Sequence, residues 1–318
     1  MAEGLALHDA ARYGKLEDLK RALANAPGGI NERGCCSGQK ETKTKQVKRT
    51  PLSWASEFGH DTCVLFLLES GAKVEIASTK GHKTALCLAC EFNHAKCAAL
   101  LLQHGAKADS VGEAHLWVNT NPLMMGCRFG ADECIAPLLE AGVNMDKWYP
   151  IMHSKYGGDV YTSRLSHCTP LGIACSYGHD KCAAHLIRAG AKINLVGVAN
   201  SDEGHSALMH AAGYGHDKCV HMLLGAGATI DLRDRYGLTA LMLACKYGHA
   251  TSAKLLLEAG ANPSLRATPM LLCGIPVGRR LTARDLAKVD IEVVTLLDEW
   301  LKKNTSTSST SPALPNQV

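Results

Sequence analysis

A short phrase recurs along this chain at a nearly constant interval, and this recurrence limits the possible fold more than any other feature. Six copies begin with Thr, Ser or Asn, continue with Pro or Ala and then reach Leu. Their first residues are Thr50, Thr84, Asn121, Thr169, Ser206 and Thr239. The leucines Leu52 and Leu86 lie 34 residues apart, and Leu208 and Leu241 lie 33 apart. A period near 33 residues is typical of a solenoid of stacked helix pairs.

The residues of each copy fit the two helices of one such pair. Thr, Ser or Asn suits a helix N-cap, and Pro or Ala suits the first helical position. After the phrase come an aromatic residue, a short link, an apolar run and a glycine that can end a second helix with a left-handed cap. The aromatic positions are Phe58, Phe92, Phe129, Tyr177, Tyr214 and Tyr247. The pattern therefore predicts two short helices in each copy.

This pattern resembles the ankyrin repeat family, whose unit carries Thr-Pro-Leu-His-x-Ala and Gly-His signatures. The resemblance covers residues 4–301. It implies an all-α ankyrin-repeat solenoid over residues 1–301, with seven to eight helix-turn-helix units, loop insertions and degenerate end caps. The expected units are 4–31, 50–80, 84–112, 121–146, 169–197, 206–235 and 239–266, with a C-terminal cap at 281–301. Residues 302–318 are rich in Ser and Thr, and we expect a disordered tail there.

The family's two histidine positions are unequally kept. The histidine of the Thr-Pro-Leu-His phrase survives only as His8, whereas the second histidine recurs five times. Its positions are His60, His94, His179, His216 and His249. On a repeating scaffold we expect this second histidine to bond the backbone of the adjoining loop rather than a ligand.

Extra spacing between copies marks insertions, which in solenoids map to loops that often bind partners. The first, residues 33–49, has six basic residues and one acidic residue. Lys43, Lys45, Lys48 and Arg49 are its candidate contact residues, either for an acidic partner or for nuclear import. The alternative is a solvated loop, which is the common outcome for basic runs.

The second insertion follows Asn144 and concentrates aromatic residues in a chain in which they make up only 5%. Its candidates are Trp148, Tyr149, Tyr156 and Tyr161. Because Trp and Tyr are frequent hot spots of protein interfaces, we expect this loop to anchor a partner. The alternative is that the aromatic rings cover their own repeat.

The fourteen cysteines do not predict a disulfide framework. The N-terminus has no basic and apolar segments of a signal peptide, so we expect an intracellular protein with free thiols. Cysteines at one position of neighbouring repeats are about 10 Å apart, too far for a shared zinc ion. We expect the series that contain Cys63 and Cys90 to be buried, and Cys35 and Cys36 to be exposed.

Other classes of function are disfavoured. The chain lacks phosphate-loop, nucleophile-elbow and zinc-protease motifs, so we expect no enzyme, no cofactor, no bound metal and no small-molecule substrate. The formal charge of +4 argues against nucleic-acid binding. The longest apolar stretch, at 269–277, is too short for membrane insertion.

The resemblance implies a non-catalytic scaffold or adaptor that binds a protein partner on its concave face and inserted loops. A regulatory or targeting subunit of an enzyme complex is the alternative, followed by a redox- or metal-sensing solenoid. The expected location is the cytoplasm, with the nucleus as an alternative. The resemblance also suggests hydroxylation of Asn194, which lies eight residues after Leu186.

Overall fold

The computed structural model describes most of the repeated region of the chain. The described residues are 2–25, 27–36, 47–79, 82–110, 121–152, 165–196, 204–267, 271–272, 275–276, 281–287 and 290–305. They divide into two compact units, residues 1–192 and residues 193–318. None of the described helices is long and apolar enough to cross a bilayer.

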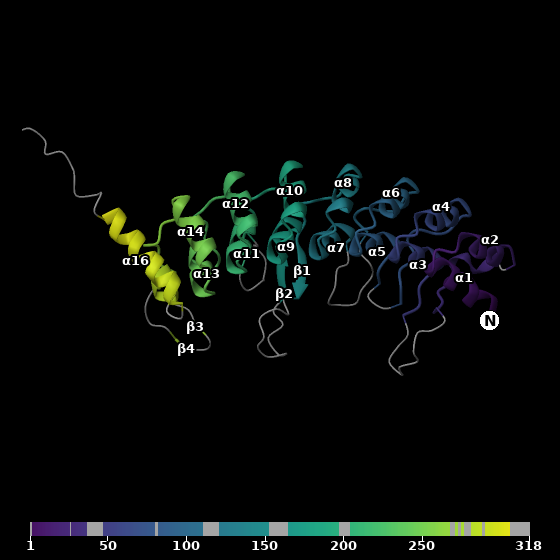
Figure 1. The fold of residues 1–318 in the computed structure, drawn as a ribbon, viewed down its shortest axis with the longest axis horizontal. Coiled ribbons are helices and arrows are strands. Elements are labelled where there is room, and N and C mark those ends of the chain that lie inside the picture. Colours follow the sequence, from purple (N-terminus) through teal and green to yellow (C-terminus); the bar gives the residue numbers. More distant parts are fainter. Residues whose placement is uncertain are drawn as a thin grey trace, which may run out of the picture. The chain divides into compact units, whose positions relative to one another are not determined.

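Unit 1 is built from helix pairs in which a first helix is followed by an antiparallel second helix (Figure 1). The pairs are α1 (Ala2–Arg12) with α2 (Leu16–Asn25), α3 (Pro51–Glu57) with α4 (Asp61–Glu69), α5 (Ala85–Glu91) with α6 (Ala95–Gln103), α7 (Pro122–Phe129) with α8 (Asp132–Glu140), and α9 (Pro170–Tyr177) with α10 (Asp180–Arg188). A 3₁₀ helix, η1 (Pro27–Asn31), follows α2. Each first helix packs on the next first helix, and each second helix on the next second helix.

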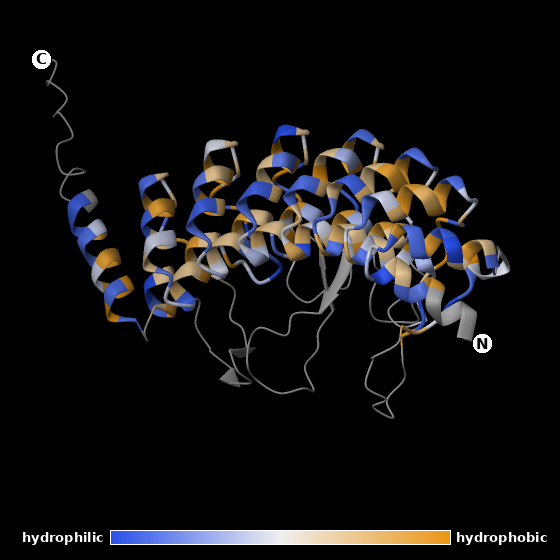
Figure 2. Ribbon diagram, turned by 45° about the vertical axis from the view of Figure 1, so that its right-hand side comes forward, coloured by the Kyte–Doolittle hydropathy of each residue, from blue (hydrophilic) through white to orange (hydrophobic). Residues whose placement is uncertain are grey.

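The first helices begin where the phrase predicts, because its polar residue caps them. Thr50 Oγ1 accepts a hydrogen bond from the backbone N–H of Ser53, and Thr84 Oγ1 accepts one from that of Cys87. The first helices are buried along nearly their whole length. In Figure 2 the second helices carry hydrophobic residues beside hydrophilic ones, as expected of helices with one solvated face.

The second histidine of each copy links neighbouring repeats, which confirms the expected backbone bond. Nε2 donates to a carbonyl of the preceding repeat in four described cases. The pairs are His60 with Arg12 (2.9 Å), His94 with Glu57 (3.0 Å), His179 with Arg128 (3.0 Å) and His249 with Gly213 (3.1 Å). The imidazole also packs on the glycine of that repeat: a Cβ added at Gly59 would lie 2.5 Å from His94 Nδ1.

A second ladder joins the repeats at the loops that follow the second helices. A side-chain oxygen of one repeat accepts a hydrogen bond from a backbone N–H of the next. In unit 1 the acceptor and donor residues are Asn31 and Lys73, Glu75 and Lys107, Asp109 and Asn144, and Asp146 and Lys192. Carboxylate and amide oxygens thus satisfy backbone donors that the loops would otherwise leave to water.

Unit 2 continues the same architecture. Its helices are α11 (Ala207–Gly213), α12 (Asp217–Gly225), α13 (Ala240–Lys246), α14 (Ala250–Glu258), α15 (Ala283–Leu286) and α16 (Ile291–Thr305). Thr282 caps α15 in a reciprocal bond with Asp285. The last helix, α16, extends to Thr305, so the first residues of the predicted tail are helical. The rest of the tail, 306–318, lies outside the described residues.

Two short hairpins interrupt the helical repeats. Strand β1 (Tyr149–Met152) pairs antiparallel with β2 (Leu165–Cys168), with Tyr149 opposite Cys168. Strand β3 (Leu271–Leu272) pairs with β4 (Ile275–Pro276). The all-α prediction is therefore confirmed for the repeats, whereas these insertions form local β-structure.

Candidate protein-interaction surface

In four of the five described helix pairs of unit 1, one aromatic side chain stands exposed at the end of the first helix. We call Tyr13, Phe58, Phe92 and Phe129 the aromatic row. Their exposed fractions are 54%, 42%, 47% and 47%. The rings occupy equivalent positions in helices that pack side by side, so the repeat itself aligns them. Tyr177, the fifth member of the series, is only half-buried rather than exposed.

The rings are held by the histidines of the inter-repeat ladder. Phe58 stacks on His60 with 6.4 Å between ring centroids, and Phe92 stacks on His94 with 6.5 Å. Because each of these histidines also bonds the preceding repeat, the aromatic rings are pre-positioned. A rigid aromatic surface loses little entropy on binding a partner.

Two arginines lie across neighbouring rings of this series. The guanidinium of Arg12 lies 5.5 Å from the Tyr13 ring centroid and 5.4 Å from that of Phe58. Arg128 lies 5.6 Å from Phe129 and 5.9 Å from Tyr177. All four distances are within the range of cation–π attraction.

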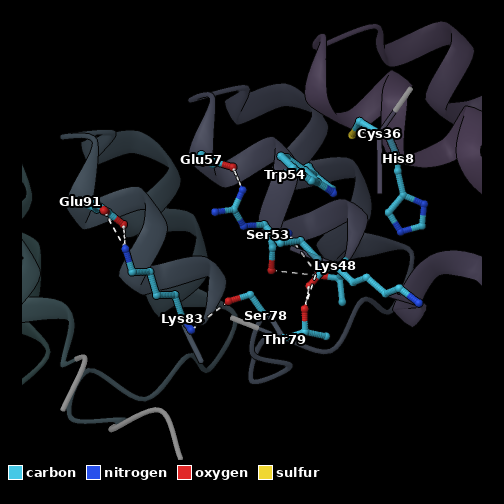
Figure 3. A network of polar contacts seen from close by, with 12 residues as sticks. His8, Cys36, Lys48, Ser53, Trp54, Glu57, Ser78, Thr79, Lys83 and Glu91 are labelled. Carbon is cyan, nitrogen blue, oxygen red and sulfur yellow. Dashed lines mark hydrogen bonds and ion pairs between the residues drawn. The ribbon is translucent and has the colours of Figure 1, made fainter. Parts of the chain in front are cut away.

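Two ion pairs lie beside the middle of the row. Glu57 pairs with Arg49, and Glu91 accepts two bonds from Lys83 Nζ at 2.7 and 2.6 Å. Figure 3 shows the Lys83–Glu91 pair and the carboxylate of Glu57 on the neighbouring helix. Burial raises the pKa of the Glu57 carboxyl, even though Arg49 acts to lower it. The charged form of Glu57 is thus incompletely compensated by its partner.

The candidates of the first insertion are separated by the structure. Arg49 turns inward: its guanidinium lies 4.7 Å from the Trp54 ring centroid and pairs with Glu57. Lys48 is exposed, while its backbone N–H donates to Thr79 Oγ1 at 2.9 Å. Lys43 and Lys45 lie outside the described residues. Arg49 therefore serves the protein's own packing.

The base of the first insertion is closed by backbone pairing. Gly34 and Arg49 exchange two backbone hydrogen bonds of 2.9 and 3.1 Å. The Trp54 indole N–H donates to the Gly34 carbonyl at 3.3 Å. The insertion therefore leaves and rejoins the repeat at adjacent positions.

The candidates of the second insertion are only partly described. Trp148 is half-buried, and Tyr149 opens strand β1. Tyr156 and Tyr161 lie outside the described residues. The proposed modification site, Asn194, is exposed, and its Oδ1 accepts a hydrogen bond from the Thr229 N–H at 2.8 Å. Asn194 is thus one rung of the loop ladder.

The cysteines behave as core residues with one correction. Thirteen are free in the described residues, and all of these except the half-buried Cys35 are buried. The expected exposure of Cys36 is wrong, because its Sγ lies against the His8 carbonyl at 3.5 Å. Burial, with Asp9 nearby, raises the pKa of Cys36 to about 12. Among the described residues, no three His, Cys, Asp or Glu side chains converge as a metal site would require.

Ankyrin-repeat family models match most of the chain. The model described as three copies of ankyrin repeats matches residues 7–112, 75–150 and 195–267, and a single ankyrin repeat model matches 166–198. The chain belongs to the ankyrin repeat family. Ankyrin repeats are generally non-catalytic scaffolds for protein–protein interaction, and the chain belongs to this general class of interaction proteins.

Curated relatives share only part of their length with this ankyrin repeat protein. Human ankyrin repeat and SOCS box protein 1 is 36% identical over 83 residues, which are 25% of this chain and 22% of the relative. The mouse protein of the same name is 37% identical over 79 residues, or 24% and 21%. The chain thus spans about a fifth of the length of the curated relatives it matches.

Solved structures match the repeats over a longer range. The ankyrin repeat domain of human ASB11 is similar with a TM-score of 0.59 and 27% identity, over 81% of this chain and 99% of that one. The ankyrin repeat domain of Bcl-3 has a TM-score of 0.57 and 22% identity, over 79% and 98%. The Bcl-3 likeness shows the fold alone.

The sequence interpretation missed the aromatic row as a candidate site. Its signal was present, because an aromatic residue recurs in all six copies of the phrase, as Phe in three and as Tyr in the other three. That recurrence was used only as a mark of the repeat. Periodicity alone does not tell whether a recurring aromatic side chain faces the core or the solvent.

Proposed function

We propose that this chain is an interaction scaffold that binds a protein partner through the aromatic row of unit 1, with the inserted loops as additional contacts. The observation that carries the proposal is the row itself: four large aromatic side chains stand about half exposed at equivalent positions. Aligned exposed apolar groups on a folded domain mark interaction surfaces. Aromatic anchors commonly supply most of the binding energy of a protein interface.

The proposal is tested by affinity capture with the full chain and quantitative mass spectrometry. The test variant replaces Phe58, Phe92 and Phe129 by Ala. The control replaces Leu65 by Ala, since Leu65 is also an exposed apolar side chain of unit 1 but lies on a second helix. We expect the triple variant to lose partners that the control retains.

Thermal unfolding of each variant shows whether that variant is still folded. Because the three rings are about half exposed, we expect the triple variant to keep a cooperative transition. A captured set that is the same for the wild type, the triple variant and the control would contradict the proposal.

We place this interaction in the cytoplasm or the nucleus, and we propose Trp148 as a second anchor. Trp148 directly precedes the hairpin of β1 and β2 and is only half-buried, so part of its ring is open to a partner. Capture also reveals whether the partner is an enzyme, for which this chain would act as a regulatory or targeting subunit.

A further inference from the structure

The residue that precedes each ring of the aromatic row changes charge along unit 1. Arg12 precedes Tyr13 and Arg128 precedes Phe129, whereas the two central rings follow carboxylates, Glu57 and Glu91. Equivalent positions of neighbouring repeats lie side by side in unit 1, because each first helix packs on the next. The row therefore has cationic residues at its two ends and anionic residues at its centre.

The two ends of the row show which type of side chain fits beside two neighbouring rings. At each end, a guanidinium lies over two neighbouring rings of the series at distances from 5.4 to 5.9 Å. Arginine suits this position because its planar cation stacks on aromatic faces. The chain thus supplies its own arginine at both ends.

Phe92, one of the two central rings, has no arginine over it within the described part of the chain. Its only recorded ring contact there is the stack with His94. Glu57 and Glu91 occupy the positions that hold Arg12 and Arg128 at the ends of the row. Their side chains pair with Arg49 and Lys83. Phe92 remains 47% exposed, with Glu91 next to it in the chain and Glu57 at the equivalent position of the preceding repeat.

The carboxylates retain acceptor capacity. Arg49 donates to Oε2 of Glu57, and no described residue donates to Oε1. A carboxylate can accept more than one hydrogen bond at each oxygen, and a guanidinium has five donors. Arg49 and Lys83 carry one positive charge each against the two carboxylates, so these four groups present no net positive charge to an incoming cation.

Two arginines of the chain already lie near one aromatic ring, that of the buried Trp54. Arg12 and Arg49 lie 5.5 and 4.7 Å from the same ring centroid, that of Trp54. The fold thus already places more than one arginine near a single aromatic ring, one repeat before Phe92.

We propose that Phe92, Glu57 and Glu91 form the docking site for an arginine side chain of the protein partner. The guanidinium would stack on Phe92 and donate hydrogen bonds to the free Glu57 oxygen and to Glu91. This inference rests on the proposed function, because it names the chemistry of the partner at the centre of the aromatic row. A lysine fits less well, since its ammonium is not planar and cannot stack flat on the ring or present two parallel N–H donors from separate nitrogens.

The test pans a random 12-residue phage-displayed peptide library against the full chain. The variant carries Glu57→Gln and Glu91→Gln. The matched control carries Glu133→Gln and Glu140→Gln, which remove the same charge from exposed positions on α8. We expect peptides selected by the wild type and the control to be enriched in arginine over lysine by at least several-fold, and this enrichment to vanish with the variant.

A selected peptide is then measured by fluorescence anisotropy, with its arginine replaced by citrulline, which keeps the shape and removes the charge. We expect roughly a 10-fold or greater loss of affinity for the wild type and little change for the Glu57→Gln, Glu91→Gln variant. If that variant does not fold, Phe92→Leu replaces it, because an exposed ring is removed while apolar bulk is kept.

The two proposals fail differently. Selected peptides without arginine that still require Phe58 and Phe129 would overturn the arginine site and support the aromatic row. Arginine enrichment that survives in the Glu57→Gln, Glu91→Gln variant would also overturn the site. Peptide binding that is unchanged when each ring of the row is replaced would overturn both proposals.

Discussion

Units 1 and 2 carry an aromatic residue at the same place in the repeat, but its surroundings differ. In unit 1, Phe58 and Phe92 are exposed, and charged residues lie beside them. In unit 2, Tyr247 is also exposed, at 38%, whereas Tyr214 is half-buried and stacks on His210 with 6.5 Å between centroids. His210 is itself buried and meets the ring of His205 edge-on at 5.4 Å.

This difference arises outside the repeated phrase. His205 belongs to the segment that leads into α11, and its Nε2 lies 3.3 Å from Oδ2 of the fully buried Asp234 carboxylate. The repeat therefore determines where an aromatic residue is placed, whereas residues of the connecting loops determine whether it is covered. Binding at this position is expected where the cover is absent.

The largest expected effect separates a covered aromatic residue from an exposed one in the same unit. Trp54 is fully buried and lies under two guanidinium groups, whereas Phe92 is about half exposed. Trp54→Ala should lower the free energy of unfolding by about 3–5 kcal/mol, and Phe92→Ala by about 1 kcal/mol or less. Urea denaturation measures both. Equal losses would show that the row is part of the core.

The adjacent thiols Cys35 and Cys36 provide the next contrast. Cys36 is buried with a pKa raised to about 12, whereas Cys35 is half-buried. Because thiolate and access both limit alkylation, iodoacetamide at pH 8 should modify Cys35 roughly 100-fold faster or more. Peptide mapping over time measures the two rates. Similar rates would contradict the packing of Cys36 against His8.

Asp234 tests how strongly a connecting loop of unit 2 is held in place, and Ser78 of unit 1 is the matched control. Asp234 Oδ1 accepts bonds from the N–H groups of Tyr236 and Leu238 at 2.9 and 2.7 Å, whereas Ser78 Oγ accepts one from Lys83 at 3.1 Å. Asp234→Ala should cost about 2–3 kcal/mol and Ser78→Ala about 1 kcal/mol, because more buried donors lose their partner. Thermal unfolding measures both, and the reverse order would refute the assignment.

Trp148 tests whether the second insertion adds to the row. If it anchors the partner, Trp148→Ala should weaken binding by about 2 kcal/mol and leave the unfolding midpoint nearly unchanged. Titration calorimetry with the captured partner and a thermal scan of the same variant give the two values. Lost stability with intact binding would mean that Trp148 covers its own repeat.

The smallest effect concerns the pH dependence at the centre of the row. Burial raises the pKa of Glu57 above its ordinary value of 4.5. A carboxyl group whose pKa is raised by folding stabilises the protein fully at a pH below its unfolded-state pKa. This contribution is lost as the pH rises through the folded-state pKa. Glu57→Gln should therefore flatten the fall in stability from pH 4.5 upward, by about 1 kcal/mol or less, relative to Glu133→Gln. Identical pH profiles of the two variants would contradict it.

Much of the fold was predictable because its determinants are local or strictly periodic. The N-caps Thr50 and Thr84 and the bond of His60 and its equivalents to the neighbouring repeat follow from residue type and spacing. Even the burial of the Cys63 series follows, since a small apolar side chain suits the interval between packed helices. For these features, the sequence by itself determined the structure.

The candidate site needed the tertiary structure. The sequence predicts Arg49 as a partner contact, yet Trp54 and Glu57 hold it in the structure. Cys36 is covered by α1, at His8, 28 positions earlier in the chain. Phe92 is 47% exposed, whereas Tyr214 at the equivalent position of another repeat is half-buried. Such cover comes from residues far apart in the chain, so only the packing of repeats decides which side chains remain exposed to a partner.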